Sequence, residues 1–311
     1  MSEIEVNHLT KDYGSGRGVF DVSFQIGESE CFGFLGPNGA GKSTTIRHLM
    51  GFAKPDSGET RILGKESFAH YDEVLHEVGY IPGEIALPAG LTGYGFLKME
   101  QDLQGIQNPE QQKKMLNLFH LEDNLLLGET KRMSLGVKRK LAIVAAFQGD
   151  PKVLILDEPT SGLDPLMQEV FVNLIHSEKK AGKTILLSSH IFSEIDSTCD
   201  RIAIIKDGRL VSTFKADDLK HASTKFYNIT FPNDEAYQRF LANHGQADYF
   251  KILNKDDRKY SLFISADDKD INRLISHLSH YNLVAFTNQK ETLQDYFMKF
   301  YKENQNFGGD L

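Results

Sequence analysis

The sequence predicts an α/β domain built on a parallel sheet, followed by a small α+β domain. Two short apolar runs, 152–157 ("KVLILD") and 183–189 ("KTILLSS"), lack polar alternation, which is typical of parallel strands covered on both faces. A glycine-rich stretch, 36–44 ("GPNGAGKST"), joins a third apolar run to a helical pattern. From about residue 216 onward, strand and helix patterns alternate at short intervals, which indicates a second domain.

The composition is that of an ordinary globular protein with room for two cores. Of the 311 residues, 40% are hydrophobic and 25% are charged, and we place the two domains at residues 1–215 and 216–311. The formal net charge of −8 argues against a nucleic-acid partner, because proteins that bind phosphate backbones are usually basic. Only Cys31 and Cys199 are present, which predicts reduced thiols in a cytosolic chain. No apolar run reaches the roughly 18 residues that cross a bilayer, so we expect any membrane role to depend on a partner.

The first part of the larger domain reads as strands and one helix. The runs 4–9 ("IEVNHL") and 18–26 ("GVFDVSFQI") and the run that ends at Leu35 are interpreted as antiparallel strands. A helix follows the glycine-rich stretch and ends near Gly51.

The rest of this domain contains an insertion and a hairpin. The pattern between Pro82 and Met133 is helical and more polar, so we interpret it as a helical subdomain inserted into the α/β domain. Residues 201–214 ("RIAIIKDGRLVSTF") predict two strands around Asp207-Gly208, a dipeptide that suits a tight hairpin turn and closes the domain.

The smaller domain alternates strands with helices. Strands are expected in "KFYNITF", "KYSLFIS" and "LVAFTN", and helices in "DEAYQRFLANHG", "DINRLISHLSHY" and "TLQDYFMKFY". This order suggests a ferredoxin-like α+β fold.

The glycine-rich stretch fits a phosphate-binding loop. In Gly36-x4-Gly41-Lys42-Ser43, glycines let backbone N–H groups curl around phosphate oxygens, and the following helix points its positive end at them. Lys42 is expected to reach the β- and γ-phosphates of a nucleotide, and the Ser43 hydroxyl to reach Mg²⁺. The predicted nucleotide-binding residues of this loop are Gly36, Pro37, Asn38, Gly39, Ala40, Gly41, Lys42, Ser43 and Thr44.

A second motif supports this interpretation. The stretch "VLILDEP" places Asp157 and Glu158 at the carboxyl end of a buried strand, where ligands bind in open α/β sheets. We expect Asp157 to hold Mg²⁺ through its water shell and Glu158 to polarise an attacking water.

Together these motifs resemble those of ATP-binding cassette (ABC) transporter nucleotide-binding subunits, over roughly residues 2–215. The resemblance implies a P-loop NTPase fold with antiparallel β and helical subdomains, Tyr13 stacking on adenine, and His190 of "SSH" acting at the γ-phosphate. "MSLGVKRK" stands in place of the family signature LSGGQ, and "SGLD", which ends at Asp164, matches the D-loop.

The chain departs from the family pattern in two places. The family usually has glutamine after the proline of its Q-loop, whereas this chain has Gly83 followed by Glu84, which either replaces that glutamine near Mg²⁺ or is an ordinary loop carboxylate. In the signature, Leu135 replaces a glycine while Ser134 and Gly136 remain available to the γ-phosphate. Such variants are similar to those of drug- and peptide-antibiotic exporter subunits.

The resemblance also implies a mechanism and partners. In this family the signature of one subunit covers the ATP bound to another, so the chain is expected to form a homodimer or to pair with a related subunit. ATP closes the dimer, hydrolysis opens it, and the helical subdomain passes the motion to a separate membrane-spanning permease. The protein would then be cytoplasmic, attached to the inner face of the cell membrane through that permease.

Two other classes remain open at this point. One is a soluble ABC ATPase without a transport role, although such proteins usually carry two cassettes or long coiled coils, which this chain lacks. The other is a regulatory ATP binder that does not hydrolyse ATP, which the missing glutamine makes conceivable. Glu158 and His190, both present, argue against the binder.

Overall fold

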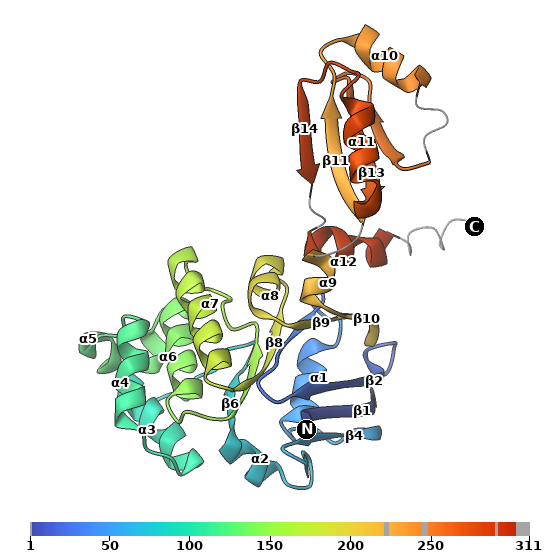
Figure 1. The fold of residues 1–311 in the computed structure, drawn as a ribbon. Helices are drawn as coiled ribbons and strands as arrows, with labels where there is room; N and C mark the ends of the chain where they lie inside the picture. The colour runs from blue at the N-terminus through green and yellow to red at the C-terminus, as the bar shows by residue number, and fades with distance from the viewer. Residues whose placement is uncertain (1, 221–223, 244–247, 290–291, 303–311) are drawn as a thin grey trace. The chain divides into compact units, whose positions relative to one another are not determined.

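The computed structural model describes residues 2–220, 224–243, 248–289 and 292–302 (Figure 1). It separates into two compact units, Met1–Ala216 and Asp217–Leu311. Each unit has its own sheets and core, and each is described by itself.

A six-stranded sheet forms the centre of the first unit. Its strands lie in the order β10-β9-β3-β8-β7-β6, and only the β9–β10 pair is antiparallel. Every residue of β3, β7 and β8 is buried, as expected of strands covered on both faces. The strands are β3 (Cys31–Leu35), β6 (Val78–Ile81), β7 (Val153–Asp157), β8 (Thr184–Ser189), β9 (Arg201–Lys206) and β10 (Arg209–Lys215).

The prediction that Cys31–Leu35 continues an antiparallel series is wrong. This strand, β3, pairs in parallel with β8 on one side and β9 on the other. Its five residues are all apolar or glycine and all buried, a pattern that marks a central strand rather than one with a solvent face.

A smaller antiparallel sheet lies beside the first, in the order β2-β1-β4-β5. Its first two strands were predicted, but the last two were not. The strands are β1 (Ser2–Asp12), β2 (Gly18–Gly27), β4 (Ser57–Ile62) and β5 (Lys65–Glu66). Phe24 of β2 stacks on Phe32 of β3 with ring centroids 5.1 Å apart, so the two sheets share one core.

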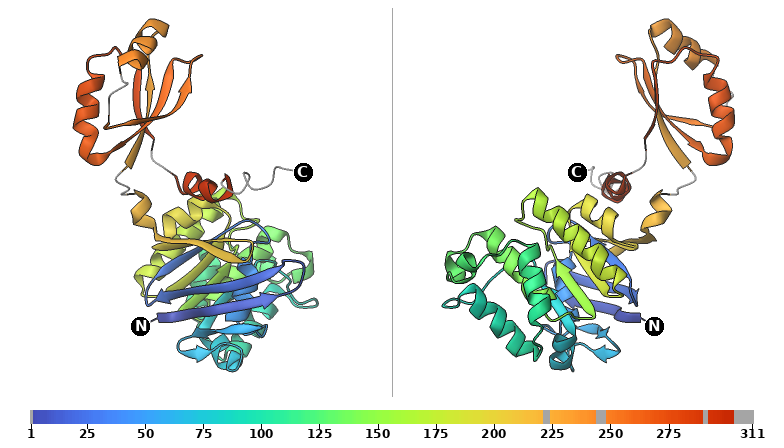
Figure 2. Two further views of the ribbon diagram at one scale, coloured as in Figure 1. Left: turned by 90° about the vertical axis from the view of Figure 1, so that its right-hand side faces the viewer. Right: turned by 60° about the vertical axis from the view of Figure 1, so that its left-hand side comes forward.

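Helices flank the six-stranded sheet on both faces (Figure 2). Helix α1 contacts β2, β4 and β7, and α8 contacts β3 and β8. The helices of this unit and its boundary are α1 (Lys42–Leu49), α2 (Tyr71–Glu77), α3 (Gly93–Gln104), α4 (Pro109–Leu118), α5 (Asp123–Leu126), η1 (Thr130–Arg132), α6 (Leu135–Phe147), α7 (Pro165–Lys180), α8 (Phe192–Thr198) and α9 (Ala216–Lys220).

Two local predictions are confirmed in this unit. The segment between Pro82 and Met133 is helical, with α3 and α4 begun by the side-chain caps Thr92 and Asn108. The β9–β10 hairpin turns at Asp207 (φ 48°) and Gly208 (φ 72°), the left-handed conformation that this dipeptide favours.

The second unit has the β-α-β-β-α-β order and antiparallel sheet of a ferredoxin-like fold, as predicted. Its sheet order is β12-β13-β11-β14, and Tyr237 and Phe240 of α10 are buried in its core. Strand β12 was not predicted, and His244 and Gly245, which end one predicted helix, lie outside the described residues. The elements are β11 (Thr224–Thr230), α10 (Asp234–Asn243), β12 (Lys251–Asp256), β13 (Ser261–Asp267), η2 (Asp268–Asp270), α11 (Ile271–Leu278), β14 (Ala285–Gln289) and α12 (Leu293–Lys302).

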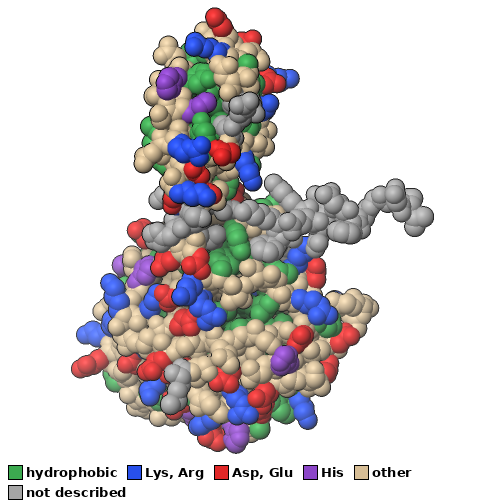
Figure 3. Space-filling model, turned by 45° about the vertical axis from the view of Figure 1, so that its right-hand side comes forward, with side chains coloured by type: hydrophobic (Ala, Val, Ile, Leu, Met, Phe, Trp, Pro, Cys, Tyr) green, Lys and Arg blue, Asp and Glu red, His purple; other side chains and the backbone are tan. Residues whose placement is uncertain are grey.

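The charged surface is mixed in sign. Acidic and basic side chains are interspersed over the face shown in Figure 3. None of the helices in the described ranges is long and apolar enough to cross a bilayer.

Candidate functional site

The glycine-rich loop connects β3 to α1, as the sequence predicts. Gly41 precedes the helix with φ 111°, and a Cβ added there would lie 2.8 Å from Val19 Cγ1. A Cβ on Gly36 would lie 2.6 Å from Ile205 O, so both positions require glycine. No side chain caps the first turn of α1 and no acidic residue lies in it, which leaves its N–H groups able to bind an anion.

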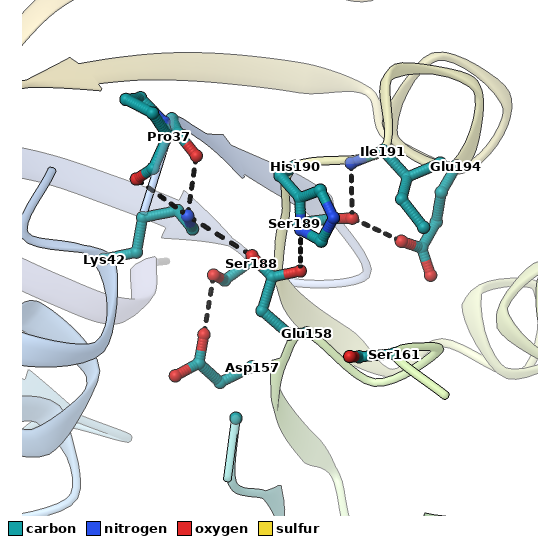
Figure 4. Close-up of polar contacts among 12 residues, drawn as sticks. Pro37, Lys42, Asp157, Glu158, Ser161, Ser188, Ser189, His190, Ile191 and Glu194 are labelled. Atoms are coloured by element: carbon teal, nitrogen blue, oxygen red, sulfur yellow. Dashed lines mark hydrogen bonds and ion pairs between the residues drawn. The ribbon is translucent and has the colours of Figure 1, made fainter. Parts of the chain in front are cut away.

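Lys42 folds over this loop. Its side chain is only 5% exposed, and Nζ donates hydrogen bonds to Gly36 O (2.6 Å) and Pro37 O (3.3 Å) (Figure 4). The same nitrogen lies 3.3 Å from Glu158 Oε1. One buried cation therefore joins the loop to the end of β7.

The carboxyl end of β7 carries the two predicted acidic residues. Asp157 is 2% exposed, and its Oδ1 accepts a hydrogen bond from Ser188 Oγ on β8 (2.8 Å). Glu158 turns away from the strand with φ 48°, and its Oε2 accepts a hydrogen bond from His190 Nδ1 (2.6 Å) (Figure 4). Its Oε1 accepts no hydrogen bond from any described residue, although Lys42 is within ion-pair distance.

A pocket of about 630 Å³ opens at this place and gathers residues from four segments of the chain. Six predicted or neighbouring side chains of the site line it: Asn38, Ser43, Glu84, Asp157, Glu158 and His190. The rest of the wall is Arg47, Phe52, Tyr80, Pro82, Gly83 and Ser161. Burial, with Asp157 nearby, raises the pKa of Tyr80 to about 12, so its hydroxyl stays protonated.

Four predicted site residues lie outside both this pocket and the phosphate-binding loop. Tyr13 lies just after β1, with a ring that is 53% exposed and Lys11 Nζ 5.9 Å from its centroid. Ser134 caps α6 by accepting a hydrogen bond from Val137 N (3.3 Å), and Gly136 lies in the first turn of that helix. Asp164 caps α7 through Met167 N (3.0 Å).

The signature and the D-loop adjoin each other in this chain. A Cβ on Gly162 would lie 3.1 Å from Leu135 Cδ2, and one on Gly136 would lie 3.2 Å from Gly162 O. The Leu135 side chain is nevertheless 58% exposed. Leu135, Gly136 and Gly162 thus share one surface outside the pocket, whereas Ser161, the first residue of the D-loop, lines the pocket.

Gly83 lies directly against Asp157. A Cβ at this position would come within 2.9 Å of Asp157 Oδ2, so a side chain at residue 83 would force that carboxylate to shift. Glu84 is exposed and reaches the pocket wall.

Restoring the family residue at this position is expected to impair the protein. In a Gly83→Gln variant Asp157 must move and strain its bond to Ser188, and overpacking of this kind costs on the order of 1–3 kcal/mol. We expect ATP turnover to fall roughly tenfold, measured by phosphate release. Gly83→Ala separates the effect of the β-carbon from that of the amide. Parent activity in both variants would contradict the close contact.

Sequence reasoning missed three residues that shape the site. Ser188 is the first serine of "SSH" and could have been found from that motif. Arg139 carries no local signal, because its three partners lie 22 to 57 residues away along the chain. The hydrogen-bond partner of Glu194 is local, but nothing in the nearby sequence indicates that this carboxyl is buried. Glu194 is 4% exposed and accepts a hydrogen bond from Ser189 Oγ (2.5 Å), next to His190.

Glu194 is expected to make stability depend on pH. Burial raises its pKa from 4.5 to about 7, against the lowering effect of hydrogen bonds from Ser189 and Thr160. The folded chain therefore binds this proton more tightly than the unfolded chain does. The resulting contribution to the free energy of unfolding is complete below pH 4.5 and is lost as the pH rises to about 7. The loss is on the order of 3 kcal/mol.

A Glu194→Gln variant removes this titration. Urea denaturation between pH 4.5 and 7.5 should show a flatter free energy of unfolding than in the parent, because the amide stays neutral throughout. Glu110→Gln, on the exposed first turn of α4, is the matched control. Parallel curves for the parent and Glu194→Gln would show that Glu194 is not the group responsible.

The chain is similar to known proteins over most of its length. Residues 19–161 match the family model described as ABC transporter. Over 301 residues the chain is 32% identical to the bacitracin transport ATP-binding protein BcrA of Bacillus licheniformis, and the match covers 95% of this chain and 96% of that protein. The chain belongs to the ABC transporter ATP-binding proteins.

Two further comparisons agree with this assignment. The ABC transporter subunit is 36% identical over 211 residues to the Nod factor export ATP-binding protein I of Sinorhizobium fredii, covering 67% of this chain and 61% of that protein. A solved structure titled as the ATP-binding subunit of an ABC transporter is 31% identical, with a TM-score of 0.66, covering 70% of this chain and 92% of the other. The ABC subunit is thus an ATP-binding ATPase, and its likeness to the bacitracin protein extends into residues 217–311.

Proposed function

We propose that this ABC ATPase hydrolyses ATP in the pocket beside Glu158 and energises export through a separate membrane permease. The observation that carries the proposal is the cluster at the end of β7, where Glu158 contacts both Lys42 and His190. The names of two relatives, which refer to bacitracin transport and to Nod factor export, support a drug- or peptide-antibiotic-type exporter.

The phosphate-binding loop holds the nucleotide in this proposal. The N–H groups from Gly39 to Thr44 surround the phosphates, and Lys42 places its ammonium group beside the β- and γ-phosphates. Tyr13, with its half-exposed ring, stacks on adenine.

The donor set of the pocket fits Mg²⁺. No three His, Cys, Asp or Glu side chains gather into a metal cage in the described ranges, and Mg²⁺ does not need one, because it binds one or two protein oxygens together with phosphates and water. Ser43 and Asp157 would hold the ion, with Glu84 at the pocket wall as a further carboxylate. When bound, Mg²⁺ supplies positive charge to the phosphate oxygens.

Glu158 is the base in the proposed reaction. Its Oε1 faces Lys42 and accepts no hydrogen bond from the described residues, so this oxygen is available to take a proton from the attacking water. Its Oε2 is held by His190, which orients the carboxylate and acts at the γ-phosphate.

A second subunit completes the site in this proposal. Ser134, Gly136 and Asp164 lie outside the pocket of their own chain, on the surface that Leu135 and Gly162 share. They contact ATP only if they cover the pocket of another copy or of a related subunit. ATP then stabilises the closed dimer, and its hydrolysis releases it.

The permease is proposed to dock on an apolar groove of about 500 Å³. The groove lies between α2, β6 and the helices α3 and α6, and Phe52 and Leu103 on its wall are 48% and 65% exposed. Glu100 lies in the same wall, and its burial raises its pKa. Attachment through this groove places the subunit on the cytoplasmic face of the cell membrane.

The proposal is tested with the full chain and the product of the neighbouring reading frame, which is expected to be a membrane protein. Co-purification from detergent-solubilised membranes, together with phosphate release that the membrane protein stimulates, is the expected result. Phosphate release without a membrane partner would indicate a soluble ATPase instead. ATP binding without phosphate release would indicate a regulatory binder.

A further inference from the structure

Arg139 is a buried arginine whose bonds all go to the backbone. It lies in α6, is 2% exposed, and forms no ion pair with a carboxylate in the described part of the chain. Nε donates to Ser161 O (3.0 Å), one terminal nitrogen to Pro82 O (3.0 Å) and the other to Gly83 O (2.8 Å). All three nitrogens of the guanidinium are therefore used to hold two separate loops.

Both loops adjoin the acidic residues of the pocket. Gly83 lies against Asp157, a close approach that the absence of a β-carbon allows. Ser161 closes the turn after Glu158, because its N–H donates to Glu158 O (3.2 Å). One guanidinium thus fixes the segments that border both Asp157 and Glu158.

The positive charge of Arg139 also interacts with the acidic residues of the pocket. Burial lowers its pKa, while the negative charges of Asp157 and Glu158 favour its protonated form. A buried guanidinium is costly unless its hydrogen bonds are satisfied, and here three charge-assisted bonds to carbonyl oxygens satisfy them.

Arg139 lies on the helix that begins with the signature. Ser134 caps α6, and Arg139 follows five residues later on the same rigid helix. The loop at Pro82–Gly83 leads from β6 into the helical segment that starts with α3. A movement of α6 therefore displaces the loop at Pro82–Gly83, and the reverse also holds, because the guanidinium binds both.

We propose that Arg139 is a positioning residue that couples the ATP pocket to the signature helix. The inference rests on the proposed function, because it assigns Arg139 a part in ATP turnover. Arg139 holds the loop 82–83 and the turn 158–161 in register with α6, so that Asp157 and Glu158 keep their places relative to Ser134.

The first test measures the loops directly and needs no activity. Hydrogen-exchange mass spectrometry is applied to the full-length parent, Arg139→Gln and Arg139→Lys, with Arg132→Gln, an exposed arginine that precedes α6, as the control. We expect amides at 82–90 and 159–163 to exchange about tenfold faster in Arg139→Gln, with a smaller change in Arg139→Lys and none in Arg132→Gln. Uniformly faster exchange across residues 2–215, or no change, would overturn the proposal.

The second test separates positioning from folding and binding. We expect Arg139→Gln to lower kcat for ATP roughly 10–100-fold, because small displacements of catalytic groups have effects of this size. The Kd for a fluorescent ATP analogue should stay within about threefold of the parent, and Arg139→Lys should recover part of kcat. A kcat within twofold of the parent, or an equal loss of kcat and nucleotide affinity, would refute the assignment.

The two tests also distinguish this inference from the proposed function. A parent protein that releases no phosphate contradicts the proposed function alone. The exchange experiment still decides whether Arg139 holds the two loops.

Discussion

Glu158→Gln is expected to lower the rate of ATP hydrolysis by roughly 10²–10⁴-fold and to leave ATP binding intact. Glutamine keeps the shape of the side chain and can still pair with His190, but it cannot accept a proton from water. The loss therefore appears in kcat rather than in affinity. Phosphate release and equilibrium binding of a fluorescent ATP analogue measure the two quantities separately.

The Glu158→Gln variant has a second expected property. Since ATP binds but is not consumed, the closed dimer should accumulate, which size-exclusion chromatography with and without ATP can detect. Glu110→Gln, exposed on α4, controls for the loss of a surface carboxylate. Hydrolysis by Glu158→Gln at close to the parent rate would mean that another group is the base.

Two inactive variants regain activity when they are mixed. Lys42→Ala removes the buried ammonium group from the loop, which weakens ATP binding by on the order of 1.5–3 kcal/mol. Ser134→Arg places a bulky cation where the signature is proposed to meet ATP on the opposite chain. Each variant is expected to be nearly inactive alone, yet a mixed dimer contains one site with an intact loop and an intact signature.

The mixing experiment is read from ATPase activity against the ratio of the two variants. A maximum near equal amounts is expected, together with parent activity per chain that rises with protein concentration. Mixtures of Lys42→Ala with Lys42→Ala,Ser134→Arg double variants contain no complete site and provide the baseline. Concentration-independent activity from a proven monomer contradicts the shared site, whereas failed complementation alone leaves strict coupling between the two sites as an explanation.

Most residues of the candidate site could be predicted from local sequence motifs. The loop 36–44, Asp157 and Glu158 were predicted because each owes its conformation to its immediate neighbours, namely glycines before a helix and an apolar strand before two carboxylates. The hairpin at Asp207-Gly208 was predictable for the same reason. The roles given to these residues in ATP turnover stay predictions for the variants above.

The direction of a strand relative to its neighbours could not be predicted from the local sequence pattern alone. The local pattern predicts an antiparallel strand in the run ending at Leu35, but hydrogen bonds to β8 and β9, more than 140 residues away along the chain, make it parallel. Strands β4, β5, β6 and β12 were missed because they are short or have few apolar residues.

The sequence by itself determined the phosphate-binding loop, the acidic end of β7 and the order of the family motifs, because these depend on residues close together in the chain. Only the tertiary structure decided that Arg139 binds two loops, that Gly83 lies against Asp157, and that Glu194 is buried near His190. The physical reason is that burial and hydrogen-bond partners come from whichever segments the packed sheets bring together, and residue order does not state which these are.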